Sequence, residues 1–359
     1  MTQFIGVPVS GASASQLRTT PIAIYRVGSS DVVFVLATTG CALPSCLRLF
    51  RSTSAAESFT RENPPPVRAE QGTFAGTLRS MQFANVSDGY AIVGTNDPTS
   101  LYATNNGART WHKVTIQKGV TTLGLTTTLH EIYAITGICS TKGSCHDYRI
   151  ARSPLSANRW TSSPMPMGHS AKYGMWGFPY VPDAFGNDVW ISEQPPGPAV
   201  TFYSRDGGRS FRKLTTPKLG SVNSCALIPE TAVALWADCP TGMQESFFFS
   251  KNAGVTWTSA PQQQFMGTGG GSFDPVSASL AFLDYGGPGP FVRITTSPRK
   301  ATTIGAPSCS KDSSIGDLTF TNGRDGLSIC SPNSSQAGVR LVKSIDGGKK
   351  WLSVSLTSA

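Results

Sequence analysis

Charged side chains and long hydrophobic runs are both scarce in this 359-residue sequence. Asp, Glu, Lys and Arg together make up 14% of the chain, against about 25% in ordinary globular domains. No stretch approaches the roughly 18 consecutive apolar residues that a membrane-spanning helix requires. The hydrophobic share of 39% is nevertheless too high for a disordered chain. We therefore expect a folded, soluble protein without a transmembrane segment.

Runs of like charge are absent, although the net charge is +9, from 30 Lys and Arg against 21 Asp and Glu. Nowhere do five or more like charges follow one another, and the basic residues are scattered along the chain. A nucleic-acid partner is therefore not expected, because such partners select a basic patch or stripe. A diffuse positive field suits anionic polymers or surfaces instead.

Several catalytic signatures are also missing. The chain has no G-x-S-x-G nucleophile elbow, no H-E-x-x-H zinc helix, no P-loop and no dinucleotide fingerprint. Its four histidines, His112, His130, His146 and His169, are dispersed in the sequence. We expect neither a metal nor a cofactor.

Turn-forming residues are abundant, with 37 Gly and 25 Pro, which favours many short elements joined by many turns. They accompany a repeated octapeptide with Ser or Thr first, Asp or Asn third, and Trp or Phe last. Four copies are well formed: TNNGARTW at 104–111, SRDGGRSF at 204–211, SKNAGVTW at 250–257 and SIDGGKKW at 344–351. Three degenerate copies begin at 52, 153 and 296, so the seven starts are separated by 52, 49, 51, 46, 46 and 48 residues. This regularity predicts seven structural units of nearly constant length.

These octapeptides resemble the Asp-box, or BNR repeat, of sialidases, sortilin-type receptors, xyloglucanases and the Ycf48 photosystem-assembly family. In those proteins the box closes the hairpin between the third and fourth strands of each propeller blade. The resemblance implies an all-β fold, a single seven-bladed β-propeller with four-stranded antiparallel blades. The third residue of each box is then a structural acceptor for loop amides and not a catalytic group. These residues are Asn106, Asp206, Asn252 and Asp346.

The sequence between the boxes agrees with this architecture. Each unit alternates short strands and turns, as in SMQFA, NVSDG and YAIVGT before the box at 104–111. Four strands in about 40–50 residues are typical of a propeller blade. Seven blades fill residues 19–359 and leave residues 1–18 as an N-terminal arm, which could close the ring as an extra strand. The arm lacks a basic n-region, so it does not predict a signal peptide.

The eight cysteines form four pairs of near neighbours in the sequence. A single pairing closes four short local loops: Cys41–Cys46, Cys139–Cys145, Cys225–Cys239 and Cys309–Cys330. Zinc is the alternative, but the spacings lack a second tight pair or a companion histidine motif. Disulfides are favoured, and they predict a secreted protein, extracellular or periplasmic.

Strand direction alternates within a propeller blade, so its loops divide between two faces. The boxes lie on one face, and all four predicted disulfides map to the other, where they either rigidify the longest loops or preorganise a binding surface. The predicted function is therefore a secreted propeller that binds a glycan or protein partner, and an anionic ligand would suit the net charge. The candidate binding residues are Arg79, Tyr173, Trp176, Asp274 and Tyr285. For Tyr173 and Trp176, packing between blades is favoured over sugar stacking.

A glycan-active enzyme is the alternative prediction, and the sequence leaves open whether the protein is an enzyme. Glycoside hydrolysis needs two carboxyl groups roughly 5–10 Å apart, and loops around a central depression can supply such a pair. The candidate acids for a glycoside hydrolase or polysaccharide lyase are Glu193, Asp238 and Asp317. Sialidase activity is not expected, because the chain has no Arg-Ile-Pro segment.

Overall fold

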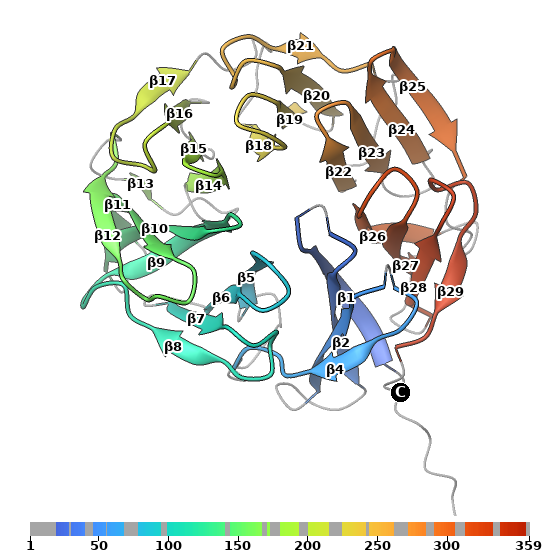
Figure 1. Cartoon of the computed structure of the whole chain (residues 1–359), viewed down its shortest axis with the longest axis horizontal. Coiled ribbons are helices and arrows are strands. Elements are labelled where there is room, and N and C mark those ends of the chain that lie inside the picture. The colour runs from blue at the N-terminus through green and yellow to red at the C-terminus, as the bar shows by residue number, and fades with distance from the viewer. Residues whose placement is uncertain are drawn as a thin grey trace, which may run out of the picture.

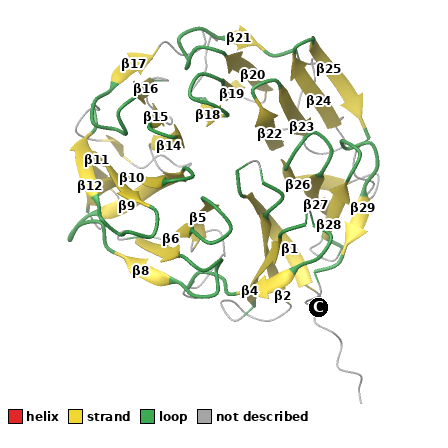
Figure 2. Cartoon of the chain, in the orientation of Figure 1, coloured by secondary structure: helices red, strands yellow, loops and turns green. Residues whose placement is uncertain are grey.

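Seven antiparallel sheets stand around a common axis in the computed structural model (Figure 1). The described residues form strands and loops but no helix (Figure 2), and so none that could cross a membrane. The protein is a seven-bladed β-propeller, which confirms the predicted fold class. The structure describes residues 19–28, 30–39, 46–54, 56–67, 78–94, 99–140, 144–166, 171–172, 180–193, 200–214, 225–241, 244–261, 272–284, 291–305, 313–332 and 338–356.

Each blade is built from one continuous segment, with its strands in chain order from the axis to the rim. Blade 1 contains β1 (Thr19–Arg26), β2 (Val33–Thr39), β3 (Leu47–Ser52) and β4 (Thr60–Glu62). Blade 2 contains β5 (Leu78–Phe83), β6 (Gly89–Val93), β7 (Ser100–Thr104) and β8 (His112–Val114). Blade 3 contains β9 (Thr121–Thr127), β10 (Glu131–Cys139), β11 (Ser144–Pro154) and β12 (Thr161–Pro164), and β13 (Ala171–Lys172) also pairs with β11.

The remaining four blades follow the same order. Blade 4 contains β14 (Tyr180–Phe185), β15 (Asp188–Glu193), β16 (Thr201–Ser204) and β17 (Arg212–Leu214). Blade 5 contains β18 (Ala226–Pro229), β19 (Leu235–Thr241), β20 (Gln244–Ser250) and β21 (Thr258–Ser259). Blade 6 contains β22 (Ser272–Ser277), β23 (Leu280–Asp284), β24 (Phe291–Thr296) and β25 (Arg299–Ile304). Blade 7 contains β26 (Ser313–Phe320), β27 (Gly326–Pro332), β28 (Arg340–Ser344) and β29 (Leu352–Val354).

The second strand of a blade is buried on both of its sides. In β2, residues 33–37 are all buried and read Val-Phe-Val-Leu-Ala, and β6 is buried along its whole length. Each blade packs its two faces against its two neighbours, so these strands are continuously apolar and do not alternate. The core of the protein therefore consists of the seams between adjacent blades.

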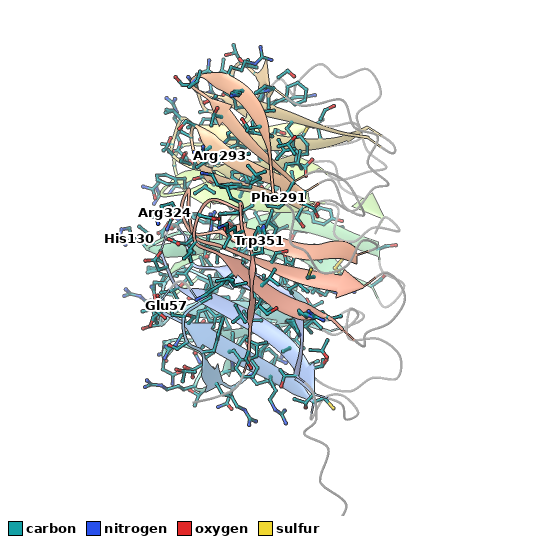
Figure 3. All side chains as sticks on the ribbon, turned by 90° about the vertical axis from the view of Figure 1, so that its right-hand side faces the viewer. Glu57, His130, Phe291, Arg293, Arg324 and Trp351 are labelled. Atoms are coloured by element: carbon teal, nitrogen blue, oxygen red, sulfur yellow. A yellow bond between two sulfur atoms is a disulfide. The ribbon has the colours of Figure 1, made fainter. Side chains whose placement is uncertain are left out.

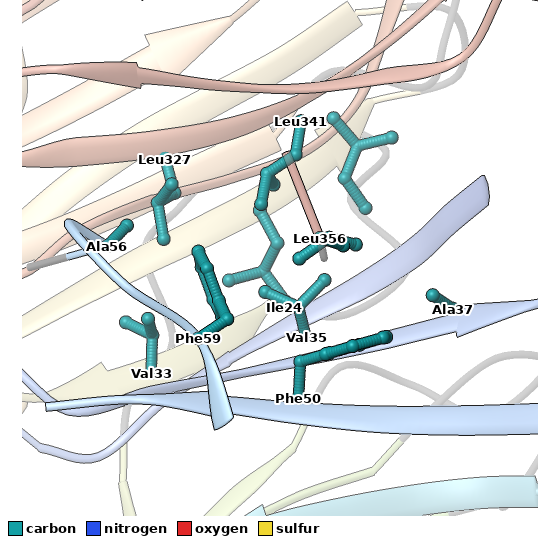
Figure 4. Packing of buried hydrophobic residues seen from close by; sticks show 11 residues of the cluster. Ile24, Val33, Val35, Ala37, Phe50, Ala56, Phe59, Leu327, Leu341 and Leu356 are labelled. Atoms are coloured by element: carbon teal, nitrogen blue, oxygen red, sulfur yellow. The ribbon is translucent and has the colours of Figure 1, made fainter. Parts of the chain in front are cut away.

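The ring closes between blades 7 and 1 by packing. Ile24, Val35 and Phe50 of blade 1 contact Leu327 and Leu341 of blade 7 in one buried cluster (Figure 4). No strand is shared between these two blades in the part of the chain that the structure describes. The N-terminal arm at 1–18 lies outside the described residues.

The well-formed octapeptides make the loops between third and fourth strands. In blade 4 the buried Ser204 hydroxyl accepts the Gly208 N–H at 2.8 Å, and Asp206 Oδ1 accepts the N–H groups of Arg209 and Ser210, both at 2.9 Å. Equivalent hydroxyl bonds are formed by Thr104, Ser250 and Ser344. The loop is thus closed by its own side chains.

The degenerate octapeptide at 296–303 forms no such loop. Thr296 pairs directly with Arg299, and β25 begins there. Position 298 is a proline where the four well-formed copies carry an Asp or Asn acceptor, and Arg299 and Lys300 replace the small residues of the loop. Without the acceptor and the glycines, the connection shortens to a tight turn.

Candidate functional site

Four ionisable side chains gather at the axis, on or next to the inner strands of four blades. We call them the axial cluster: Arg26, Glu230, Asp274 and Asp317. Arg26 Nη1 lies 3.8 Å from Asp274 Oδ2. The charge of Asp274 is also felt at Glu230, and that of Asp317 is felt at Asp274. Asp317 and Asp274 belong to the predicted sets, whereas Arg26 and Glu230 were not predicted.

Two acids of the axial cluster hold the inner strand of the next blade. Asp317 Oδ2 accepts the N–H of Ile24 on β1 at 2.7 Å, and Asp274 Oδ2 accepts the N–H of Phe320 on β26. An inner strand is the edge of its sheet, so its axis-facing backbone groups have no strand partner. In blade 2 a side-chain amide holds the inner strand of the next blade. Gln82 accepts the Thr127 N–H and donates to the Leu125 carbonyl, both on β9.

Arg26 completes this bracing. Its guanidinium donates to the carbonyl oxygens of Phe320 and of Pro275, the second at 3.0 Å. Its side chain is 18% exposed and that of Asp274 is 13% exposed, so this ion pair is partly shielded from water. Blades 1, 6 and 7 are therefore joined at the axis through one arginine.

Burial shifts the acids of the cluster toward their neutral forms. It raises the pKa of Glu230 to about 7 and that of Asp274 to about 6, while Arg26 opposes both shifts. Burial likewise raises the pKa of Asp317, against the hydrogen bonds from Ile24 and Leu318. On β14, burial raises the pKa of Asp183 well above its usual range, and its Oδ2 atom has no hydrogen-bond partner among the described residues. Glu230, whose pKa lies near neutral pH, is the member of the cluster best suited to proton transfer.

The three predicted catalytic acids lie on different strands. Asp317 is on inner strand β26, and Asp238 is on β19, paired with Ala226 and Phe247. Glu193 ends β15, and its side chain is not among the described ones. Asp238 and Asp317 thus lie in different blades, on β19 of blade 5 and β26 of blade 7.

The predicted binding residues are also separated. Asp274 belongs to the axial cluster, while Arg79 on β5 donates from Nε to the Gly94 carbonyl at 2.9 Å. Tyr173, Trp176 and Tyr285 lie outside the described residues.

The two described disulfides lie at one end of the molecule, opposite the turns between first and second strands. The turns that carry Glu57, His130 and Arg324 share one end (Figure 3), which we call the turn face. Because the strands are antiparallel, the connection between β10 and β11 lies at the other end, and Cys139–Cys145 bridges it. The second bridge, Cys225–Cys239, joins the start of β18 to β19. Both predicted pairings are confirmed.

The other two predicted bridges have one cysteine each among the described residues. Cys46 and Cys330 are disulfide-bonded, and their predicted partners, Cys41 and Cys309, lie outside those residues. None of the described cysteines is free.

The hairpin of blade 3 carries exposed side chains beside its disulfide. Ile138 is 40% exposed, and His146 and Asp147 are exposed on the strand opposite. We call Ile138, His146 and Asp147 the hairpin tip. A bridge between directly paired strands fixes its shape.

No protein-family model and no curated protein matches this chain. Solved structures do match. Ycf48 bound to the D1 peptide is 13% identical with a TM-score of 0.54, over 81% of this chain and 86% of that chain. Oligogalacturonate lyase from Vibrio parahaemolyticus is 10% identical with a TM-score of 0.57, over 94% and 96%. The xyloglucanase from Xanthomonas campestris is 16% identical with a TM-score of 0.53, over 82% of this chain but 47% of the enzyme. The shared feature is the propeller. At these identities the likeness shows the fold alone.

Proposed function

We propose that the protein is a secreted, non-catalytic propeller that binds a protein or glycan partner through its disulfide-braced face. The observation that carries this proposal is that two acids of the axial cluster are engaged in hydrogen bonds to the backbone. Asp274 and Asp317 each accept a backbone N–H of the neighbouring blade. A carboxylate that holds a buried amide loses this charge-assisted bond when it takes up a proton. These two acids are therefore poor acid–base catalysts and good structural acceptors.

The braced face supports the binding role. Two disulfides fix connections at that end, and the hairpin tip presents an exposed isoleucine beside charged and polar groups. A preorganised surface binds with less loss of conformational entropy. Disulfides also persist in oxidising compartments, which supports secretion. Among similar structures, Ycf48 was solved with a peptide, which is consistent with a protein partner.

A glycan-active enzyme remains the second candidate, because one acid of the cluster is not used in this way. Glu230 holds no backbone amide among the described residues, and burial raises its pKa to about 7. It lies close enough to Arg26 and Asp274 to feel both charges. A carboxyl group of this pKa suits a general acid, and two of the similar structures are a xyloglucanase and an oligogalacturonate lyase.

One experiment separates the two candidates. The oxidised full chain is applied to a glycan array and a peptide array, and is incubated with a panel of polysaccharides. We expect array binding that Ile138→Asp abolishes, and no release of sugar. Leu352→Asp is the matched control, since Leu352 is 56% exposed on rim strand β29 and should leave binding unchanged. Reproducible turnover that Glu230→Gln removes would replace the binding role with the enzymatic one.

A further inference from the structure

A cavity of about 430 Å³ opens at the rim, where blade 1 meets blade 2. Its walls come from the third and fourth strands of blade 1 and from the octapeptide loop of blade 2. The lining residues are Arg51, Thr60, Arg61, Glu62, Asn63 and Arg109. We call this cavity the rim pocket. It lies on the outer strands, away from both the axial cluster and the hairpin tip.

The rim pocket carries an excess of positive charge. Glu62 Oε1 lies 2.9 Å from Arg51 Nη2, and the Glu62 side chain is 5% exposed, so this acid is used internally to hold Arg51. Arg61 and Arg109 are exposed, and neither has a carboxylate within ion-pair distance among the described residues. Two guanidinium groups therefore remain for a ligand. Guanidinium groups bind carboxylate, sulfate and phosphate oxygens through paired N–H donors.

The two blades are locked together at this point. Asn63 N donates to the Ala108 carbonyl at 3.0 Å, and Trp111 Nε1 donates to the Asn63 carbonyl at 2.9 Å. The Asn63 side-chain amide donates in turn to the Arg109 carbonyl. Three hydrogen bonds thus fix the loop that carries Arg109 against the strand that carries Arg61. The walls of the pocket are preorganised, which lowers the cost of binding.

A similar seam lies between blades 3 and 4, and it shows that not all residues of the rim pocket are required for two blades to pack. There Arg152 lies against Gly207, as Arg51 lies against Gly107, and Arg209 occupies the octapeptide position of Arg109. Arg152 pairs with Thr161 as Arg51 pairs with Thr60. The following residues differ: Ser162, Ser163 and Pro164 replace Arg61, Glu62 and Asn63. A seam of this kind therefore forms without Arg61, Glu62 or Asn63.

We propose that the rim pocket binds an anionic saccharide, with the sulfate or carboxylate group of one sugar held by Arg61 and Arg109. The cavity falls within the range of roughly 300–1,000 Å³ typical of small-molecule sites and exceeds what one oxyanion fills. Thr60 adds a hydroxyl that suits sugar hydroxyls. The pocket is separate from the disulfide-braced face, so this assignment stands or falls independently of the proposed function.

The test is a calorimetric titration of the oxidised full chain with four probes at low salt. The probes are a sulfated disaccharide, a uronic-acid disaccharide, the neutral disaccharide and inorganic sulfate. We expect at least one anionic disaccharide to bind, the neutral one not to bind, and inorganic sulfate to bind at least about tenfold more weakly than the disaccharide. The sulfated and uronic-acid arms identify which oxyanion is preferred.

Three variants locate the binding. Arg61→Ala and Arg109→Ala should each weaken the anionic disaccharide by about tenfold or more, since each removes a charged hydrogen-bond donor. Arg209→Ala removes the same charge from the same loop position in blade 4 and should change affinity by less than about twofold. Both pocket arginines are exposed, so the melting temperature of each variant should match the parent.

Four outcomes overturn the assignment. These are the absence of binding by either anionic disaccharide, equal binding of the neutral disaccharide, equal losses for Arg209→Ala and Arg109→Ala, and sulfate affinity equal to that of the disaccharide. The third would indicate a response to net charge alone, and the fourth an ion site without sugar recognition.

Discussion

Asp317 of blade 7 accepts the backbone N–H of Ile24 of blade 1 at 2.7 Å, across the seam where the ring closes. Its second oxygen accepts the N–H of Leu318 at 3.1 Å. One carboxylate therefore accepts a backbone N–H from the inner edge of blade 1 and another from its own strand, β26. Its position in the seam makes it a structural residue of ring closure.

Replacement of Asp317 by Ala should weaken this seam. The change leaves two backbone N–H groups without their acceptor, which costs on the order of 1–3 kcal/mol. We expect the melting temperature, followed by circular dichroism, to fall by a few degrees. Asp317→Asn retains one acceptor oxygen and should lose less. Asp31→Ala, an exposed acid in the turn before β2, is the control and should melt like the parent. An unchanged melting temperature for Asp317→Ala would show that packing alone closes the ring.

Glu230 should make stability depend on pH in an unusual direction. Its pKa is raised by burial to about 7, so the folded state holds the proton more tightly than the unfolded state. Its stabilising contribution is complete below pH of about 4.5 and is lost as pH rises through about 7. Each pKa unit corresponds to about 1.4 kcal/mol, and partial exposure reduces the total, so we expect a loss on the order of 2 kcal/mol.

Comparison with Glu230→Gln isolates this contribution, because glutamine imitates the protonated acid. Urea unfolding of both proteins at several pH values gives the difference in free energy. The parent should equal the variant near pH 4.5 and be the less stable of the two near pH 8. A difference that does not change with pH would contradict the raised pKa.

The octapeptide acceptors should matter locally. Asp206→Ala removes the acceptor of two loop amides and of the Ser204 and Ser210 hydroxyls. We expect the melting temperature to fall by a few degrees, while affinity at the rim pocket stays within about threefold of the parent. Asn106→Ala makes the same kind of change in blade 2, where Asn106 accepts the Thr110 N–H next to Arg109. It should weaken rim-pocket binding as well as stability. If Asp206→Ala and Asn106→Ala have equal affinities at the rim pocket, the closure of the blade 2 loop does not determine the position of Arg109.

The cysteines should all be oxidised. Intact-mass measurement after alkylation without reduction should show no added group, and alkylation after reduction should add eight. Peptide mapping should then identify Cys41–Cys46 and Cys309–Cys330, alongside the two bridges already described. A free thiol in the unreduced protein, or a bridge between distant blades, would contradict the predicted framework.

The blades were predictable from the sequence because their signals are local. The octapeptide loop is closed by bonds between residues two to four positions apart, such as Ser204 with Asp206 and Asp206 with Ser210, so each well-formed copy indicates one hairpin. The turns between first and second strands repeat in the same way: Asn85 bonds to Asp88 in blade 2 as Asn322 does to Asp325 in blade 7. The copy at 296–303 predicts an octapeptide loop, but the structure has a tight turn there, in which Thr296 pairs directly with Arg299.

The axial cluster was not predictable, because its contacts join residues remote in the sequence. Arg26 and Phe320 are separated by 294 positions, and Asp274 and Phe320 by 46. Their pairing depends on which blades become neighbours and on the depth of each residue along its strand. The sequence predicts acids near the axis, but not that Asp274 and Asp317 each accept a backbone N–H from the inner strand of the next blade. The rim pocket was not predictable for the same reason, since Arg61 and Arg109 come from different blades.

The arrangement of each blade as one uninterrupted segment has a consequence for how the ring is joined. In the described part of the chain, every seam, including that between blades 7 and 1, is formed by packed side chains of two adjacent blades. The seam between blades 7 and 1 adds the bond from Asp317 to the edge strand β1. In its packing, the closing seam is thus of the same kind as the other six. A circularly permuted chain cut between blades 3 and 4 could assemble the same wheel, because the geometry assigns no blade the place of first or last.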